Sequence, residues 1–148
     1  FCQGYQSQAD VTTILPSLCV SLLSCITNRY GSYEMGSDPK PAIDMTHLAT
    51  YTQGDRELEV ELLTMFLPSA QGYIDDMATA NIAGDGVAWW RGAHSLKGVA
   101  LGVGAGEVAA LAEVAEGHRE DPADTRVDDI ADLQIAMKRV RSFVAALT

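Results

Sequence analysis

The residues best suited to chemistry lie between Trp89 and Ala100, where one histidine stands among basic and small residues. In a helix, at about 100° per residue, His94 points away from the apolar stripe that includes Trp89, and we expect it to be exposed. Arg91 and Lys97 lie three positions before and after it, and residues three apart are neighbours on a helix. The sequence therefore predicts an exposed imidazole flanked by two cations.

An imidazole in this setting is suited to accept a phosphoryl group. Adjacent positive charge favours the neutral ring, which leaves one ring nitrogen with a free lone pair to act as a nucleophile. After phosphorylation, Lys97 and Arg91 would lie within reach for charge-assisted hydrogen bonds to the new phosphoryl oxygens. The alternative, that His94 is only a solvated surface side chain, does not explain these neighbours.

Gly98 lies one turn after His94 and needs an explanation of its own. Glycine in a helix interior costs about 1 kcal/mol relative to alanine, so its use there suggests a steric reason. A position without a side chain would let a partner approach the imidazole closely. Gly92 can have the same role, or it can serve helix packing.

The H-x-L-K-G motif at residues 94–98 closely resembles the signature of the histidine phosphotransfer (HPt) domain of multistep bacterial phosphorelays, without substitution. Further residues agree with the pattern of that family: Ala93, Ala100, Val103, Gly104, Ala105 and Leu111. The resemblance extends from about residue 42 to the C-terminus. It implies that His94 is the phosphorylated residue, that Lys97 helps to hold the phosphoryl group, and that Gly98 leaves space for a receiver domain.

The resemblance also implies partners for the chain. An HPt domain accepts a phosphoryl group from the aspartyl phosphate of one receiver domain and donates it to another, so we expect receivers of response regulators and of hybrid histidine kinases to dock here. The expected docking surface comprises Trp90, Arg91, Gly98 and Leu101. No cofactor of its own is expected, because the receiver would supply the Mg²⁺ and the acidic pocket. We expect a cytoplasmic monomer.

Two other functions stay open at this point. A bundle that docks on receivers without relaying would carry an altered His94 or Lys97, and neither is altered. The phosphoacceptor domain of a chemotaxis-type histidine kinase uses a similar His-x-x-Lys-Gly helix, and the end of the chain at Thr148 leads us to expect that it is not this domain. Autonomous kinase activity is not expected, since no Gly-rich ATP-binding motif follows and Ser95, not an acidic residue, follows the histidine.

The remaining histidines and aspartates do not suggest a metal site. His47 and His118 have no carboxylate four positions further on, and both are expected to be surface residues. The aspartates between residues 121 and 132 lack the order of a calcium loop, so we expect them to favour the start of a helix.

The elements that must position these residues are helices, because apolar residues recur at helical spacing from Asp44 onward. We expect helices over residues 44–52, 55–81, 86–101 and 105–118, and a last one after the acidic loop 120–124. In the second of them the expected core face consists of Leu58, Leu62, Met65, Phe66, Tyr73 and Met77. The glycines at 102, 104 and 106 predict a turn between the third and fourth helices, and they leave the exact ends of these two helices undetermined. The predicted fold is an all-α, up-down four-helix bundle with a short extra N-terminal helix.

Length and composition agree with one globular domain. The chain has 148 residues, of which 47% are hydrophobic and 20% charged. Its net charge of -10 argues against nucleic-acid binding. The longest nearly apolar run, residues 14–26, contains Pro16 and is shorter than the roughly 20 residues that a membrane helix needs, and no basic segment precedes it as in a secretory signal.

The N-terminal part of the chain has a different composition from the rest. Residues 1–34 hold only three of the 30 charged side chains, and Met35 is followed by a polar, proline-containing stretch. We therefore expect residues 1–41 to be an extension or linker and residues 42–148 to be the domain, with Met35 as the native start and upstream-frame sequence before it. The alternative is an added helix over residues 11–27 that packs on the bundle. Three cysteines, expected to be free thiols, lie here: Cys2, Cys19 and Cys25.

Overall fold

The described part of the chain folds into helices joined by short turns. The structure is a computed structural model and describes residues 40–148. Its elements are α2 (Met45–Thr52), α3 (Arg56–Ala83), α4 (Gly86–Gly102), α5 (Gly106–Gly117), a 3₁₀ turn η1 (His118–Glu120) and α6 (Ala123–Leu147). The predicted native start at Met35, the alternative helix over residues 11–27 and the three cysteines lie outside the described residues.

Three aspartates cap the first three of these helices. The side chains of Asp44, Asp55 and Asp85 each accept hydrogen bonds from backbone N–H groups in the following turn, which carry no partner within the helix. The predicted starts of α2, α3 and α4 are therefore confirmed. The ends differ slightly from the prediction, since α3 continues to Ala83 and α5 ends one residue earlier, at Gly117.

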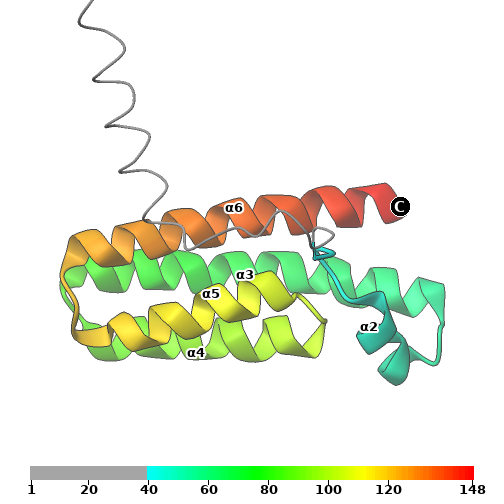
Figure 1. Ribbon diagram of the computed structural model, residues 1–148, viewed down its shortest axis with the longest axis horizontal. Helices are drawn as coiled ribbons and strands as arrows, with labels where there is room; N and C mark the ends of the chain where they lie inside the picture. The colour runs from blue at the N-terminus through cyan, green and yellow to red at the C-terminus, as the bar shows by residue number, and fades with distance from the viewer. Residues whose placement is uncertain (1–39) are drawn as a thin grey trace, which may run out of the picture. The chain divides into compact units, whose positions relative to one another are not determined.

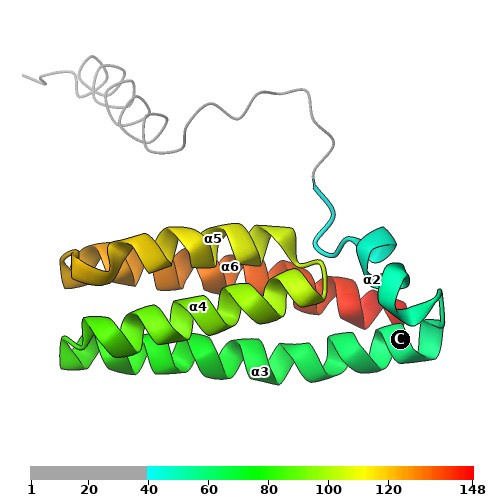
Figure 2. The same cartoon turned by 90° about the horizontal axis from the view of Figure 1, so that it is seen from below.

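The four long helices form the predicted up-down bundle (Figures 1 and 2). Helix α3 packs against α4 and α6, and α5 packs against the same two helices, so each helix lies beside the next one in the chain. The short helix α2 lies beside the end of the bundle where α3 begins (Figure 1). None of the described helices is long and apolar enough to cross a membrane.

The core lies between the helices and contains the predicted stripe of α4. Its residues Trp89, Ala93, Leu96 and Ala100 are all fully buried. In α3 the predicted core face is wrong in part, because Leu58 and Met65 are exposed. Phe66 and Met77 are buried as predicted, and Leu62 and Tyr73 pack against the core while partly buried. The other buried residues of α3 are Glu59, Leu63, Ala70, Ile74, Ala80 and Asn81. Small alanines and the buried Glu59, which accepts a hydrogen bond from Thr52 at 3.2 Å, weaken the apolar pattern there.

The turn between α4 and α5 depends on one of its three glycines. Gly104 has a positive φ of 75°, which favours glycine, and a Cβ there would lie 2.8 Å from the carbonyl oxygen of Asp44. The Gly104 carbonyl also accepts a hydrogen bond from the Asp44 N–H at 2.9 Å. This turn therefore makes α4 and α5 antiparallel neighbours and joins them to the segment that starts α2.

Candidate functional site

His94 lies in the middle of α4 with its ring directed to solvent. Its side chain is 58% exposed, which confirms the orientation predicted from the helix period. The Trp90 indole, one turn earlier, stacks on the imidazole with ring centroids 4.9 Å apart and an interplanar angle of 17°. The exposed face of α4 therefore presents an aromatic pair rather than an isolated histidine.

The neighbouring helix α5 contributes a carboxylate that the sequence analysis missed. Glu116 lies with one oxygen 2.6 Å from His94 Nδ1 and the other 2.5 Å from Lys97 Nζ. Its side chain is only 13% exposed, so the contact is shielded from solvent on the side of α5. Glu116 thus connects the two residues of the motif that were expected to act on a phosphoryl group.

An antiparallel register could have suggested this contact. A helix pair that turns at Gly104 places the residue ten positions before the turn beside those about ten positions after it, near residue 114. Glu113 and Glu116 are the acidic residues in that region. Choosing between them requires the rotation of α5 about its axis, which only the packed structure provides.

The hydrogen bond to Glu116 determines which ring nitrogen of His94 is free. A carboxylate only accepts hydrogen bonds, so Nδ1 carries a proton and donates it to Glu116. In the neutral ring the lone pair then lies on Nε2, on the far edge of the imidazole from Glu116. The exposed edge of His94 is therefore the nucleophilic one.

Lys97 and Glu116 stabilise each other's charged forms. The hydrogen bond to Glu116 raises the pKa of Lys97 above its ordinary value, although burial opposes this. Burial favours the neutral form of Glu116, but hydrogen bonds from Lys97 and His94 outweigh it and lower the pKa of this carboxyl group. Around neutral pH the site thus holds an ammonium and a carboxylate beside the imidazole.

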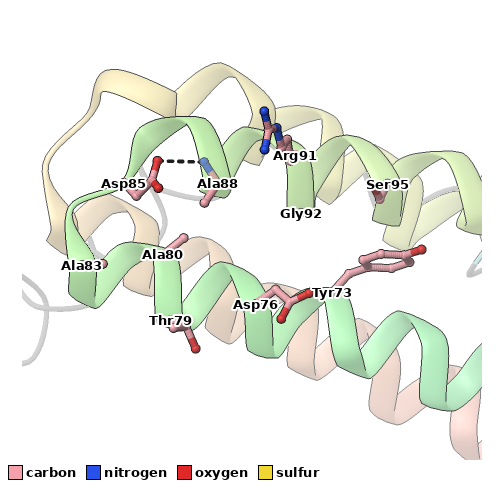
Figure 3. A pocket seen from close by; sticks show the side chains of 10 residues that line it. All are labelled: Tyr73, Asp76, Thr79, Ala80, Ala83, Asp85, Ala88, Arg91, Gly92 and Ser95. Carbon is pink, nitrogen blue, oxygen red and sulfur yellow. Dashed lines mark hydrogen bonds between the residues drawn. The ribbon is translucent and has the colours of Figure 1, made fainter.

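Of the two basic neighbours predicted for His94, Lys97 is bonded to Glu116 and Arg91 lies apart from this cluster. It lies on the other flank of α4 and lines a groove of about 430 Å³ between α3 and α4 (Figure 3). Residues three before and three after His94 lie about 60° to either side of it around the helix, so only Lys97 faces α5. Ser95 and Gly92 line the same groove.

The two glycines of α4 have different surroundings. A Cβ at Gly92 would lie 2.6 Å from Met77 Cγ and 3.3 Å from the Tyr73 carbonyl oxygen, so this glycine permits the close approach of α3. A Cβ at Gly98 would meet nothing within 4 Å, so this position is open. Gly92 thus serves helix packing, and Gly98 leaves a bare patch beside His94. Leu101, one turn further, is exposed on the same helix.

The position of Glu116 depends on contacts at the end of α5. The buried Trp89 ring donates a hydrogen bond from Nε1 to the Ala115 carbonyl at 2.7 Å. Arg126 of α6 is also buried, donates to the carbonyls of His118 and Arg119, and lies with its guanidinium carbon 5.4 Å from the centroid of the Trp89 ring. These contacts hold the backbone on both sides of Glu116.

His47 and His118 are less exposed than predicted. His118 is paired with Asp129, 2.7 Å from its Nδ1, and His47 packs edge-on against Tyr51 with its Nε2 buried. The contact with Asp129 of α6, eleven residues further along the chain, causes the difference at His118, and the local helix spacing does not reveal it. Within residues 40–148, no group of three or more histidine, cysteine, aspartate or glutamate side chains is arranged to hold a metal ion.

Comparisons with known proteins agree with this geometry. A family model described as "Hpt domain" matches residues 61–143, which is more than half of the chain and spans the site. No curated protein matches the chain. Among solved structures it is similar to histidine-containing phosphotransfer protein B (HptB) from Pseudomonas aeruginosa PAO1, with a TM-score of 0.65 and 22% identity over 73% of this chain and 95% of that chain. At this identity the structural likeness supports the fold.

Proposed function

The chain belongs to the Hpt domain family and is a phosphotransfer protein of phosphorelays, and from this premise we propose that His94 is the residue that carries the phosphoryl group. One observation carries the proposal: His94 is exposed while its Nδ1 is bonded to Glu116, which leaves Nε2 free toward solvent. A receiver domain can reach this nitrogen without any movement of the bundle.

The transfer follows from this geometry. The Nε2 lone pair attacks phosphorus of the aspartyl phosphate in line with the bond to the aspartate oxygen, at a distance of roughly 3 to 3.5 Å. The N–P bond forms while the P–O bond breaks and the aspartate leaves as a carboxylate. The Nδ1 proton stays on the ring, where Glu116 accepts its hydrogen bond. Transfer to a second receiver reverses these steps, with the electron pair of the N–P bond returning to Nε2.

Lys97 is the cation placed to act on the phosphoryl group. Its ammonium is held beside His94 by Glu116, and it has further N–H groups that can donate to phosphoryl oxygens. Arg91 lies on the opposite flank of α4 and is better placed to contact a docked receiver than the phosphoryl group. We retain Trp90, Arg91, Gly98 and Leu101 as the proposed docking surface.

The partners are receiver domains, as for other Hpt domains in phosphorelays. We propose that they include the receivers of response regulators and of hybrid histidine kinases, and that the protein acts as a cytoplasmic monomer. The Mg²⁺ required for transfer would belong to the receiver. In support of this, both oxygens of Glu116, a carboxylate bonded to His94, are already engaged.

The test is phosphotransfer from a panel of phosphorylated receivers to the wild-type protein and to His94→Gln. We expect label on the wild type that is acid-labile and base-stable, as for a phosphoramidate, and no label on His94→Gln. Incubation with ATP and Mg²⁺ alone should give no label. Label that persists on His94→Gln would show that another residue is the acceptor, and autophosphorylation would favour the chemotaxis-type kinase alternative.

A further inference from the structure

The two adjacent tryptophans of α4 have opposite environments. Trp89 is fully buried in the core, whereas Trp90 is 37% exposed and lies almost parallel to the His94 ring. Packing removes part of the apolar surface of a tryptophan ring from water, which is favourable. In the described structure Trp90 packs against the one ring on which the proposed chemistry depends.

The His94 ring is restrained from two directions. Glu116 holds the Nδ1 edge from α5, and Trp90 covers one face from the preceding turn of α4. A partial rotation of the imidazole about its Cβ–Cγ bond would break both contacts, and a half-turn would break the one to Glu116. The combination therefore keeps Nε2 directed outward, while the second face of the ring is left for solvent or a partner.

Phosphorylation of His94 is expected to strengthen the attraction between its ring and Trp90. When Nε2 bonds to phosphorus and Nδ1 keeps its proton, the imidazole ring carries a positive charge. The face of an indole ring is electron-rich and attracts an adjacent cation, with an effect at an exposed site equivalent to about a two- to fivefold change in an equilibrium constant. Trp90 is thus placed to favour the phosphorylated ring over the free one.

We propose that Trp90 is a positioning residue for His94, which orients the imidazole and stabilises its phosphorylated form by stacking, in addition to any contact with a receiver. This rests on the proposed role of His94 as the phosphoacceptor. A docking role alone would require Trp90 to be exposed but would not require its ring to lie parallel to the imidazole.

The experiment uses a phosphodonor too small to need a docking surface. Phosphoramidate transfers its phosphoryl group to imidazole nitrogen as its own P–N bond breaks and ammonia leaves. The rate of labelling and the half-life of the phosphorylated protein are measured for the wild type, Trp90→Leu and Trp90→Phe. Val87→Ala, which trims another exposed apolar residue of α4, is the control. The ¹⁵N chemical shifts of the His94 ring report how the proton is shared between its nitrogens.

We expect Trp90→Leu to be labelled about two- to fivefold more slowly, with ring nitrogen shifts moved toward a mixture of tautomers. Trp90→Phe and Val87→Ala should stay within about twofold of the wild type, since the first keeps an aromatic face and the second leaves the stack intact. If Trp90→Leu instead matches the wild type with phosphoramidate and loses only transfer from receivers, Trp90 acts in docking alone and the proposal is wrong. Equal labelling of His94→Gln would overturn the acceptor assignment itself.

Discussion

At the scale of single residues, the site depends on one carboxylate whose two oxygens accept hydrogen bonds from two different side chains. Glu116 accepts from the imidazole with one and from the ammonium of Lys97 with the other. It thereby favours the tautomer with the lone pair on Nε2, and it keeps the Lys97 ammonium beside the proposed phosphoacceptor. We therefore expect Glu116 to influence phosphotransfer through His94 and Lys97.

Replacing this carboxylate should therefore slow transfer without abolishing it. In Glu116→Ala the Nδ1 proton loses its acceptor, the two tautomers of His94 mix, and Lys97 is no longer held. We expect transfer from a receiver to fall about tenfold, the equivalent of ~1.4 kcal/mol and typical of a hydrogen bond to a charged group. Single-turnover kinetics measure the rate, and Glu113→Ala is the matched control. An unchanged rate in Glu116→Ala would show that the imidazole orients itself.

The same ion pair should leave a signature in the pH dependence of stability. The pKa of Glu116 is lowered in the folded state from 4.5, so its contribution is present above about pH 4.5 and is lost as the pH falls through the folded value. The pKa of Lys97 is raised from 10.5, so its contribution is present below about pH 10.5 and is lost as the pH rises through the folded value.

We therefore expect the melting temperature of Glu116→Gln to lie below that of the wild type at neutral pH, with the gap closing in acid below pH 4.5. Thermal unfolding of both proteins across this range measures the difference. A gap that stays constant through the acid transition would mean that the charge of Glu116 does not stabilise the fold.

At the scale of elements, α4 has different faces toward α3, toward α5 and toward the proposed receiver domain. Its buried stripe packs in the core, Gly92 lets α3 approach, Lys97 faces α5, and Gly98 is bare. The end of α5 is held by Trp89 and Arg126. The helix pair α4–α5 is thus a rigid support on which the exposed residues take defined positions.

The two glycines of α4 offer a matched pair of substitutions. Gly98→Leu introduces a side chain into open space and adds a better helix former by roughly 0.8 kcal/mol, so the fold should hold or become more stable. Transfer from receivers should nevertheless fall sharply, because the leucine keeps the receiver away from His94. Gly92→Leu should instead destabilise the fold by about 1 to 3 kcal/mol or more, since its Cβ already meets Met77.

Denaturant unfolding together with receiver phosphotransfer separates these outcomes. Wild-type transfer rates in Gly98→Leu with several receivers would show that the open patch is not the docking surface. A stable, fully folded Gly92→Leu would show that α3 can move away from α4 at little cost.

At the scale of the whole molecule, the described helices bury their apolar faces against one another. The core residues extend from Ile43 in the segment before α2 to Val144 in α6. The net charge of -10 makes the chain acidic overall, whereas the exposed His94, Trp90 and Leu101 of α4 lie near the basic residues Arg91 and Lys97. This exposed area is suited to a protein partner rather than to nucleic acid.

Because these helices already pack on each other, we expect deletion of residues 1–34 to leave the melting temperature and phosphotransfer nearly unchanged. Circular dichroism and the receiver assay measure both properties on the shortened and full chains. A large drop in melting temperature would support the alternative, in which residues 11–27 form an added helix that packs on the bundle.

Much of this protein could be predicted from local sequence patterns alone. The helix period determines the direction of a side chain relative to its own helix axis, so the exposure of His94 and the burial of Trp89 followed directly. The predicted starts of α2, α3 and α4 agree with the structure, where aspartates cap all three helices, because a cap acts within one turn.

Only the tertiary structure decided which residues of different helices meet. Glu116 stands beside His94, and Gly92 beside Met77, because of the register and rotation with which whole helices pack. The same packing left Leu58 and Met65 of α3 exposed and placed Arg91 in the groove between α3 and α4. These contacts arise between segments far apart in the chain, where no local spacing specifies the partner.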